Sequence, residues 1–146
     1  MQFTHSCEQG SQREQADNRS TNYSLPAGTN GMLPAIGHAS KLVGRFGKEL
    51  DANAGTEAVR IAALNVLSAA RHKLGSLDKV TQVVRLCVYI ATAGDFFDQP
   101  KVADAASELF RDVFGEDNAS VPMVLGVASL PLGMPEAVEV ILGVEG

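Results

Sequence analysis

Residues 121–144 read VPMVLGVASLPLGMPEAVEVILGV, and this stretch decides how the sheet of the protein is built. Two apolar runs flank a segment with two prolines and a glycine, which predicts strands at residues 123–129 and 137–144 joined by a turn. Side chains alternate between the two faces of a strand, so Val138, Val140, Leu142 and Val144 share one aliphatic face. Glu139 lies on the other face, and a carboxylate in such a run needs a partner, because burying an unpaired charge is costly.

Two helices and a further strand precede this stretch. Apolar residues recur at helical spacing over residues 56–74, and Gly75 follows as a helix terminator. The second helix begins at Asp98, which can cap it, and ends at Gly115. Its predicted apolar stripe is Val102, Ala105, Ala106, Leu109, Phe110 and Val113.

Between the helices, residues 83–91 (VVRLCVYIA) predict a strand with two distinct faces. Alternation places Val84, Leu86, Val88 and Ile90 on one face. It places Val83, Arg85, Cys87 and Tyr89 on the other face.

The N-terminal part of the chain carries weaker patterns. Residues 1–22 are rich in polar side chains and predict a mobile tail, which leaves residues 23–146 as a single domain. Residues 23–50 contain prolines and several glycines. At best they hold two short strands around residues 29–31, where Asn-Gly is a hairpin turn signal.

This order of elements predicts an α+β fold with a sheet and two helices. Each helix has one apolar stripe, so both helices should cover the same face of the sheet. The opposite face is also largely apolar, through Cys87, Tyr89 and Ile141. An uncovered apolar face predicts burial against another copy of the chain, and hence a homo-oligomer.

Composition excludes several classes of function. The net charge of -5 and the pI near 5.1 argue against a general binder of nucleic acid or of anionic membranes. No signal peptide or membrane-spanning run is evident. Cys7 and Cys87 do not suggest a disulfide framework, so a reducing compartment, the cytoplasm, is predicted. The His and Cys residues lack the spacing of metal ligands, and no cofactor motif is present, so we expect neither a metal nor a cofactor.

Several segments resemble the YjgF/RidA family. They are KLVGRFGKELD (41–51), EAVRIAALNVLSAA (57–70), DQPKVADAASEL (98–109), and GVASLPLG (126–133) followed by VEVI. The DQPKV segment is similar to one branch of the family. The resemblance implies a chorismate-mutase-like mixed sheet with two helices on one face. It also implies a homotrimer whose sheets line a central barrel, with small-molecule clefts between subunits.

Family members of the RidA type hydrolyse enamines and imines, such as 2-aminoacrylate, to 2-oxo acids and ammonia. An arginine pairs with the substrate carboxylate, and a carboxyl group serves proton transfer. The resemblance places the acid at Glu139 as the catalytic residue. It expects the arginine at position 122, where this chain has Pro122, and a cysteine at position 124, where it has Val124.

Four further residues are candidates for the substrate-binding cleft. Val124 and His38 stand at positions that the resemblance places in the cleft, although His38 also suits a surface turn. Arg85 could replace the missing arginine, because it shares a strand face with Tyr89 and Cys87. Tyr89 also suits plain packing between subunits, and Glu139 also suits a solvated edge or a salt bridge between subunits.

Two functions remain open at this point. The first is a YjgF/RidA-like protein that binds a small molecule between subunits and lacks 2-aminoacrylate deaminase activity because of Pro122. The alternative is an enamine/imine deaminase, a hydrolase of 2-imino acids, that uses Glu139.

Overall fold

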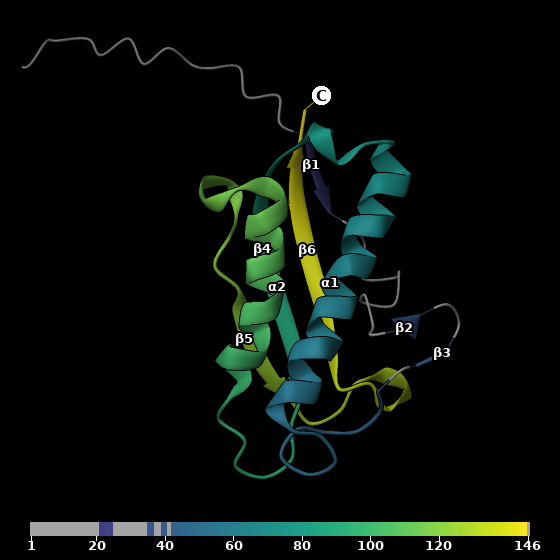
Figure 1. Cartoon of the computed structure of the whole chain (residues 1–146), viewed down its shortest axis with the longest axis vertical. Coiled ribbons are helices and arrows are strands. Elements are labelled where there is room, and N and C mark those ends of the chain that lie inside the picture. Colours follow the sequence, from purple (N-terminus) through teal and green to yellow (C-terminus); the bar gives the residue numbers. More distant parts are fainter. Residues whose placement is uncertain (1–20, 25–34, 37–38, 41, 146) are drawn as a thin grey trace, which may run out of the picture.

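The computed structural model describes residues 21–24, 35–36, 39–40 and 42–145, with side chains described from residue 42 onward. Its centre is a four-stranded mixed sheet in the order β1 (Thr21–Ser24), β6 (Glu136–Val144), β4 (Val80–Ala91) and β5 (Met123–Val127). β4 runs antiparallel to β6 and parallel to β5. Two helices, α1 (Ala52–Leu74) and α2 (Gln99–Phe114), lie together over one face of this sheet (Figure 1). The predicted α+β fold is therefore confirmed.

The two helices follow the predicted signals, with one extension. α1 begins four residues before the predicted start, because the carboxylate of Asp51 accepts a hydrogen bond from the Ala54 amide at 2.8 Å and caps the helix there. Gly75 and Gly115 end the helices as predicted. Asp98 is the N-cap residue of α2, but its side chain makes no capping hydrogen bond. Neither α1 nor α2 combines the length and the apolar character that a helix needs to cross a membrane.

The core lies between the helices and the sheet. It is built largely from alanine and valine, together with Leu86, Ile90 and the fully buried rings of Phe46 and Phe110. The aliphatic face predicted for the last strand points into this core, through Val138, Val140 and Leu142. Val113 was predicted to belong to the α2 stripe, but it is 42% exposed, because the next residue, Phe114, is the one that packs against the core in the last turn of α2.

A register irregularity corrects the predicted faces of β4. The pairing of β4 with β6 shifts between Val80 and Gln82 and again between Val83 and Arg85. Such a bulge adds a residue to one strand and breaks the alternation of side chains. As a result Val83 is buried in the core, whereas Val84, predicted to face the helices, is 42% exposed. From Leu86 to Ile90 the predicted alternation holds.

The N-terminal strands do not pair as predicted. β1 pairs with β6, whereas β2 (Ala35–Ile36) pairs with β3 (Ala39–Ser40) in a separate two-stranded sheet. The predicted hairpin between strands on either side of residues 29–31 is therefore wrong. The turn itself lies outside the described residues. A long last strand with a free edge offers β1 more hydrogen-bonding groups than a two-residue partner does.

The segment between β5 and β6 connects two strands that are not neighbours. β4 lies between them, so the connection passes the end of the sheet. It contains one 3₁₀ turn, Pro131–Gly133, in which Leu132 has a φ of 60°. The amide of Gly44 donates to the carbonyl of Gly133 at 2.9 Å and ties this turn to the segment before α1.

Candidate functional site

Glu139 finds its partner on the neighbouring strand. The hydroxyl of Tyr89 on β4 donates a hydrogen bond to Oε2 of Glu139 on β6 at 2.9 Å. Cys87 is the residue directly opposite Glu139, so Tyr89 is its diagonal neighbour, a distance that a tyrosine side chain can span. Both side chains are half-buried on the sheet face that the helices leave uncovered. These three residues form the polar cluster of that face, called here the Glu139 cluster.

The cluster keeps Tyr89 protonated. Interactions with the side chain of Cys87 and then of Glu139, together with burial, raise the pKa of Tyr89 to about 12. The phenol is therefore a hydrogen-bond donor at any physiological pH. One oxygen of Glu139 is occupied by this donor, and the remaining lone pairs of the carboxylate are available to a ligand that carries N–H or O–H groups.

Arg85 lies beside this cluster on the same face. In β4 the residues Arg85, Cys87 and Tyr89 alternate with core residues, and Arg85 is paired with Ile141 of β6. Arg85 is thus a second diagonal neighbour of Glu139, on the other side from Tyr89. Its side chain is exposed, and within the described part of the chain no hydrogen bond or ion pair holds it.

The other sequence candidates lie in different surroundings. Val124 packs against the core on the helix side of β5, away from the Glu139 cluster. Pro122 directly precedes β5 and is half-buried. His38 lies outside the described residues. Among the residues described, no group of three or more His, Cys, Asp or Glu side chains is placed to hold a metal ion.

The face around the cluster is apolar, and neither α1 nor α2 covers it (Figure 1). The register of β5 along β4 places Met123 beside Cys87 and Leu125 beside Tyr89. Met123 is 49% exposed and Leu125 is 41% exposed. Large aliphatic side chains at adjacent positions of one sheet face, with neither α1 nor α2 over them, form a patch of the kind found at protein interfaces.

Glu136 is a buried acid that the sequence analysis did not single out. It is 0% exposed, and neither carboxylate oxygen has a hydrogen-bond partner in the part of the chain that is described. Burial raises its pKa to about 8, so the side chain is largely uncharged at neutral pH. It is paired with Ile90 and lies on the core face of β6, opposite to the face of Glu139. The sequence held a signal for this position: β6 begins one residue before the predicted strand of residues 137–144, and the alternation that places Val138 and Val140 in the core also places position 136 there.

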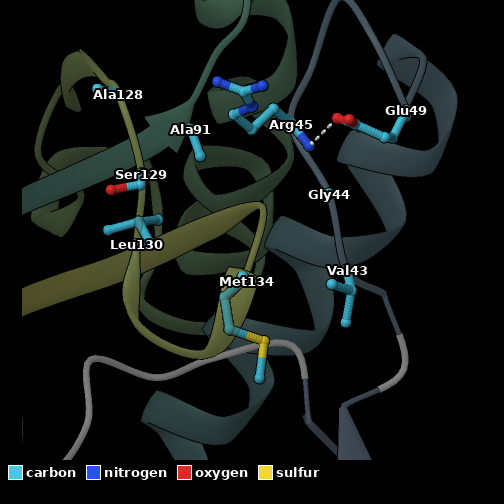
Figure 2. A pocket seen from close by; sticks show the side chains of 10 residues that line it. Val43, Gly44, Arg45, Glu49, Ala91, Ala128, Ser129, Leu130 and Met134 are labelled. Atoms are coloured by element: carbon cyan, nitrogen blue, oxygen red, sulfur yellow. Dashed lines mark hydrogen bonds between the residues drawn. The ribbon is translucent and has the colours of Figure 1, made fainter.

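A hollow of about 420 Å³ lies at the other end of β5 from Pro122. Three segments enclose it: the chain before α1, the end of β4, and the connection from β5 to β6 (Figure 2). Its walls include Arg45, Glu49, Ala91, Leu130 and Met134. Neither Glu139 nor Tyr89 lines it. No sequence pattern indicated this hollow, because it exists only where three distant segments meet.

Comparison with known proteins identifies the family of the chain. A family model described as "YjgF/chorismate mutase-like, putative endoribonuclease" matches residues 22–141. The chain is also similar to Protein TCP17 of Trypanosoma cruzi, with 38% identity over 112 residues, which span 76% of this chain and 69% of that protein.

Solved structures resemble the fold. Atu1372, a protein of unknown function from Agrobacterium tumefaciens, matches with a TM-score of 0.75 and 27% identity over 78% of this chain and 72% of that one. The structure of a "putative endoribonuclease" from Shewanella oneidensis matches with a TM-score of 0.74 and 24% identity over 78% of this chain and 76% of that one. The second likeness is one of fold alone.

Proposed function

The chain belongs to the YjgF/chorismate-mutase-like family, and on that premise we propose that it is a small-molecule-binding protein of this family without 2-aminoacrylate deaminase activity. The observation that carries the proposal is the Glu139 cluster. A carboxylate held at 2.9 Å by a tyrosine on an uncovered sheet face is a prepared acceptor for a ligand. The partner that holds it is a neutral donor, and no described cation pairs with it.

The missing cation argues against the deaminase reaction. A 2-imino acid carries its own carboxylate, and an arginine would bind it through charge-assisted hydrogen bonds worth about 1.5–3 kcal/mol each. The residue that the family resemblance expects to carry this charge is Pro122, which has neither a charge nor a backbone N–H. The Glu139 cluster suits a ligand with hydrogen-bond donors, such as an amine, an amide or an alcohol.

One observation favours the deaminase as a second candidate. Arg85 and Tyr89 flank Glu139 diagonally on the same strand, and no described residue forms a hydrogen bond or ion pair with the guanidinium of Arg85. A substrate carboxylate bound to Arg85 would lie on the same face as Glu139, which could then orient a water or move a proton. In a deaminase, Arg85 would therefore bind the substrate carboxylate in place of the arginine that the family resemblance expects at position 122.

We also propose that the ligand site is completed by assembly. The exposed Met123 and Leu125 lie on the same face as the Glu139 cluster, so a second copy covering these residues would also enclose the cluster. The family resemblance suggests a trimer with sheets facing inward. Sedimentation equilibrium of the wild type and of Leu125→Asp tests this assembly. We expect the wild type to be an oligomer and Leu125→Asp to be a smaller species, because the substitution places a charge in the proposed interface. A monomeric wild type would refute the assembly.

The activity test separates the two candidates. 2-Aminoacrylate and other 2-imino acids are generated in situ, and release of the 2-oxo acid is followed with and without the protein. We expect no acceleration for 2-aminoacrylate. Acceleration that is abolished in Glu139→Gln and weakened in Arg85→Gln would overturn the non-catalytic proposal and establish the deaminase.

Binding provides the positive test of the proposal. Ligand-observed NMR with a set of small amines, amides and alcohols should identify compounds that bind the wild type. The binding signal of these compounds should be absent with Glu139→Gln. Glu108→Gln, the same substitution at an exposed position of α2, is the matched control and should bind like the wild type. Ligands that bind Glu139→Gln and the wild type equally well would contradict a role of the cluster.

A further inference from the structure

The hollow at the end of the sheet is built before any ligand arrives. The amide of Gly44 donates to the Gly133 carbonyl at 2.9 Å, and the amide of Phe46 donates to the Ala91 carbonyl at 2.9 Å. These bonds fix the segment before α1 to both other walls of the hollow. The buried ring of Phe46 anchors the same segment in the core. A cavity with hydrogen-bonded walls does not need to be ordered by its ligand, which favours binding.

One cation of this hollow, Arg45, has no counter-charge among the residues that the structure describes. The carboxylate of Glu49 accepts a hydrogen bond from the backbone amide of Arg45 at 2.9 Å and forms an ion pair with Lys48 at 3.1 Å. Both contacts lower the pKa of Glu49, so it is ionised, and Lys48 balances its charge. In Figure 2 the guanidinium of Arg45 extends to the side away from this carboxylate. Within the described residues, no hydrogen bond or ion pair involves that guanidinium.

The remaining walls are mostly apolar. Val43, Ala91, Leu130 and Met134 line the space around Arg45. A bare inorganic anion would leave these side chains against water, whereas a ligand with one anionic end and an apolar body would contact both kinds of wall. The planar guanidinium matches a carboxylate, which it can bind through two parallel hydrogen bonds.

We propose that this hollow binds a small monocarboxylate with a compact apolar body, and that Arg45 is the residue that binds the carboxylate. The site is distinct from the Glu139 cluster, because none of Arg85, Tyr89 and Glu139 lines it. The volume of about 420 Å³ lies toward the small end of ligand pockets and accommodates a body of a few carbon atoms. The inference concerns a second ligand site and does not depend on the proposed function.

The test uses isovalerate as the probe and isovaleramide as its uncharged counterpart. Titrations of the full chain are followed by isothermal calorimetry or by ¹H–¹⁵N spectra. We expect saturable binding of isovalerate and at least about tenfold weaker binding of the amide, since the amide forfeits the charge-assisted bonds to Arg45. Inorganic phosphate should compete only weakly, because it lacks the apolar body.

Variants assign the site. Arg45→Gln should weaken isovalerate binding by at least about tenfold, whereas Arg60→Gln, the same change at an exposed position of α1, should leave it unchanged. Arg45→Gln should fold, because the bonds that Arg45 makes use its backbone: its amide binds Glu49, and its carbonyl accepts from the amides of Glu49 and Leu50. The ¹⁵N spectrum of each variant checks the fold.

Three outcomes would overturn the inference. They are the absence of saturable isovalerate binding, equal binding by Arg45→Gln and the wild type, and loss of binding in Arg85→Gln with Arg45→Gln unaffected. The last result would place the carboxylate on the uncovered sheet face. Failure of the Glu139 tests would leave these titrations unchanged, so the two proposals fail separately.

Discussion

The buried carboxyl group of Glu136 should make the stability of this protein fall as the pH rises. Its pKa is about 8 in the folded chain, compared with an ordinary value of 4.5. The folded state therefore binds more protons than the unfolded state between these two values. The change of the unfolding free energy with pH is proportional to the number of protons bound by the unfolded state minus the number bound by the folded state. This difference is negative between the two pKa values, so the stability falls as the pH rises.

The magnitude follows from the same two pKa values. A difference of about 3.5 pH units, at about 1.4 kcal/mol per unit, gives a full cost of about 5 kcal/mol above pH 8. At pH 5 the cost is below about 1 kcal/mol, because this pH is only about half a unit above the pKa of the carboxyl group in the unfolded chain. Burying an ionised carboxylate that has no partner explains the cost, since both oxygens of Glu136 lack one within the described residues.

Glu136→Gln removes this titration with little change in shape. We expect its advantage over the wild type in unfolding free energy to grow by about 3–4 kcal/mol between pH 5 and pH 8. At an m-value of about 1.5–2 kcal/mol/M for a domain of this size, the urea midpoints separate by about 2 M. Urea unfolding of both proteins at one protein concentration measures this at pH 5, 6, 7 and 8.

The control for the change in net charge is Glu108→Gln, which alters an exposed residue of α2. Its difference from the wild type should stay far smaller than that of Glu136→Gln across the series. A difference in unfolding free energy between Glu136→Gln and the wild type that stays constant from pH 5 to pH 8 would refute the reasoning. It would mean that the pKa of Glu136 is the same in the folded and unfolded states.

Three further changes test contacts of the fold, each by urea unfolding at fixed protein concentration. Gly55→Ala should destabilise the protein by about 1–3 kcal/mol, because the added Cβ would lie 2.5 Å from the ring of Phe46; no loss would contradict this packing. Asp51→Ala should cost about 1 kcal/mol through loss of the α1 cap, whereas Asp51→Asn should cost less, and equal losses would argue against capping. Tyr89→Phe should cost about 1 kcal/mol by removing the donor to the β6 carboxylate, and an unchanged stability would show that this hydrogen bond does not contribute.

The helices show how much of the fold is local. The apolar stripe of residues 56–74 and the stop at Gly75 predicted α1, because a helix presents every third or fourth residue to its core and ends where the backbone needs a left-handed turn. The start was placed too late, since Asp51 stands several residues before the first clear apolar repeat. The segment that joins the strands was also recognised, from its prolines and glycine.

The sheet shows where local information ends. The bulge in β4 exchanged the expected faces of Val83 and Val84, and the alternation of residue types gave no sign of it. The same limit applied to β1, which pairs with β6 across more than a hundred residues of sequence. Strand pairing and register are set by partners that are distant in the chain, so periodicity alone does not determine them.

The candidate site divides in the same way. The sequence by itself identified Glu139 as an acid in need of a partner and placed Tyr89 and Arg85 on one strand face, because side-chain direction in a strand follows from simple alternation. Only the tertiary structure joined Tyr89 to Glu139, buried Glu136 on the opposite face, and placed Arg45 in a hollow with no described partner for its side chain. Each of these features depends on contacts between elements that are far apart in the chain. Such contacts determine both the charge state of a side chain and which of its hydrogen-bonding groups have a partner.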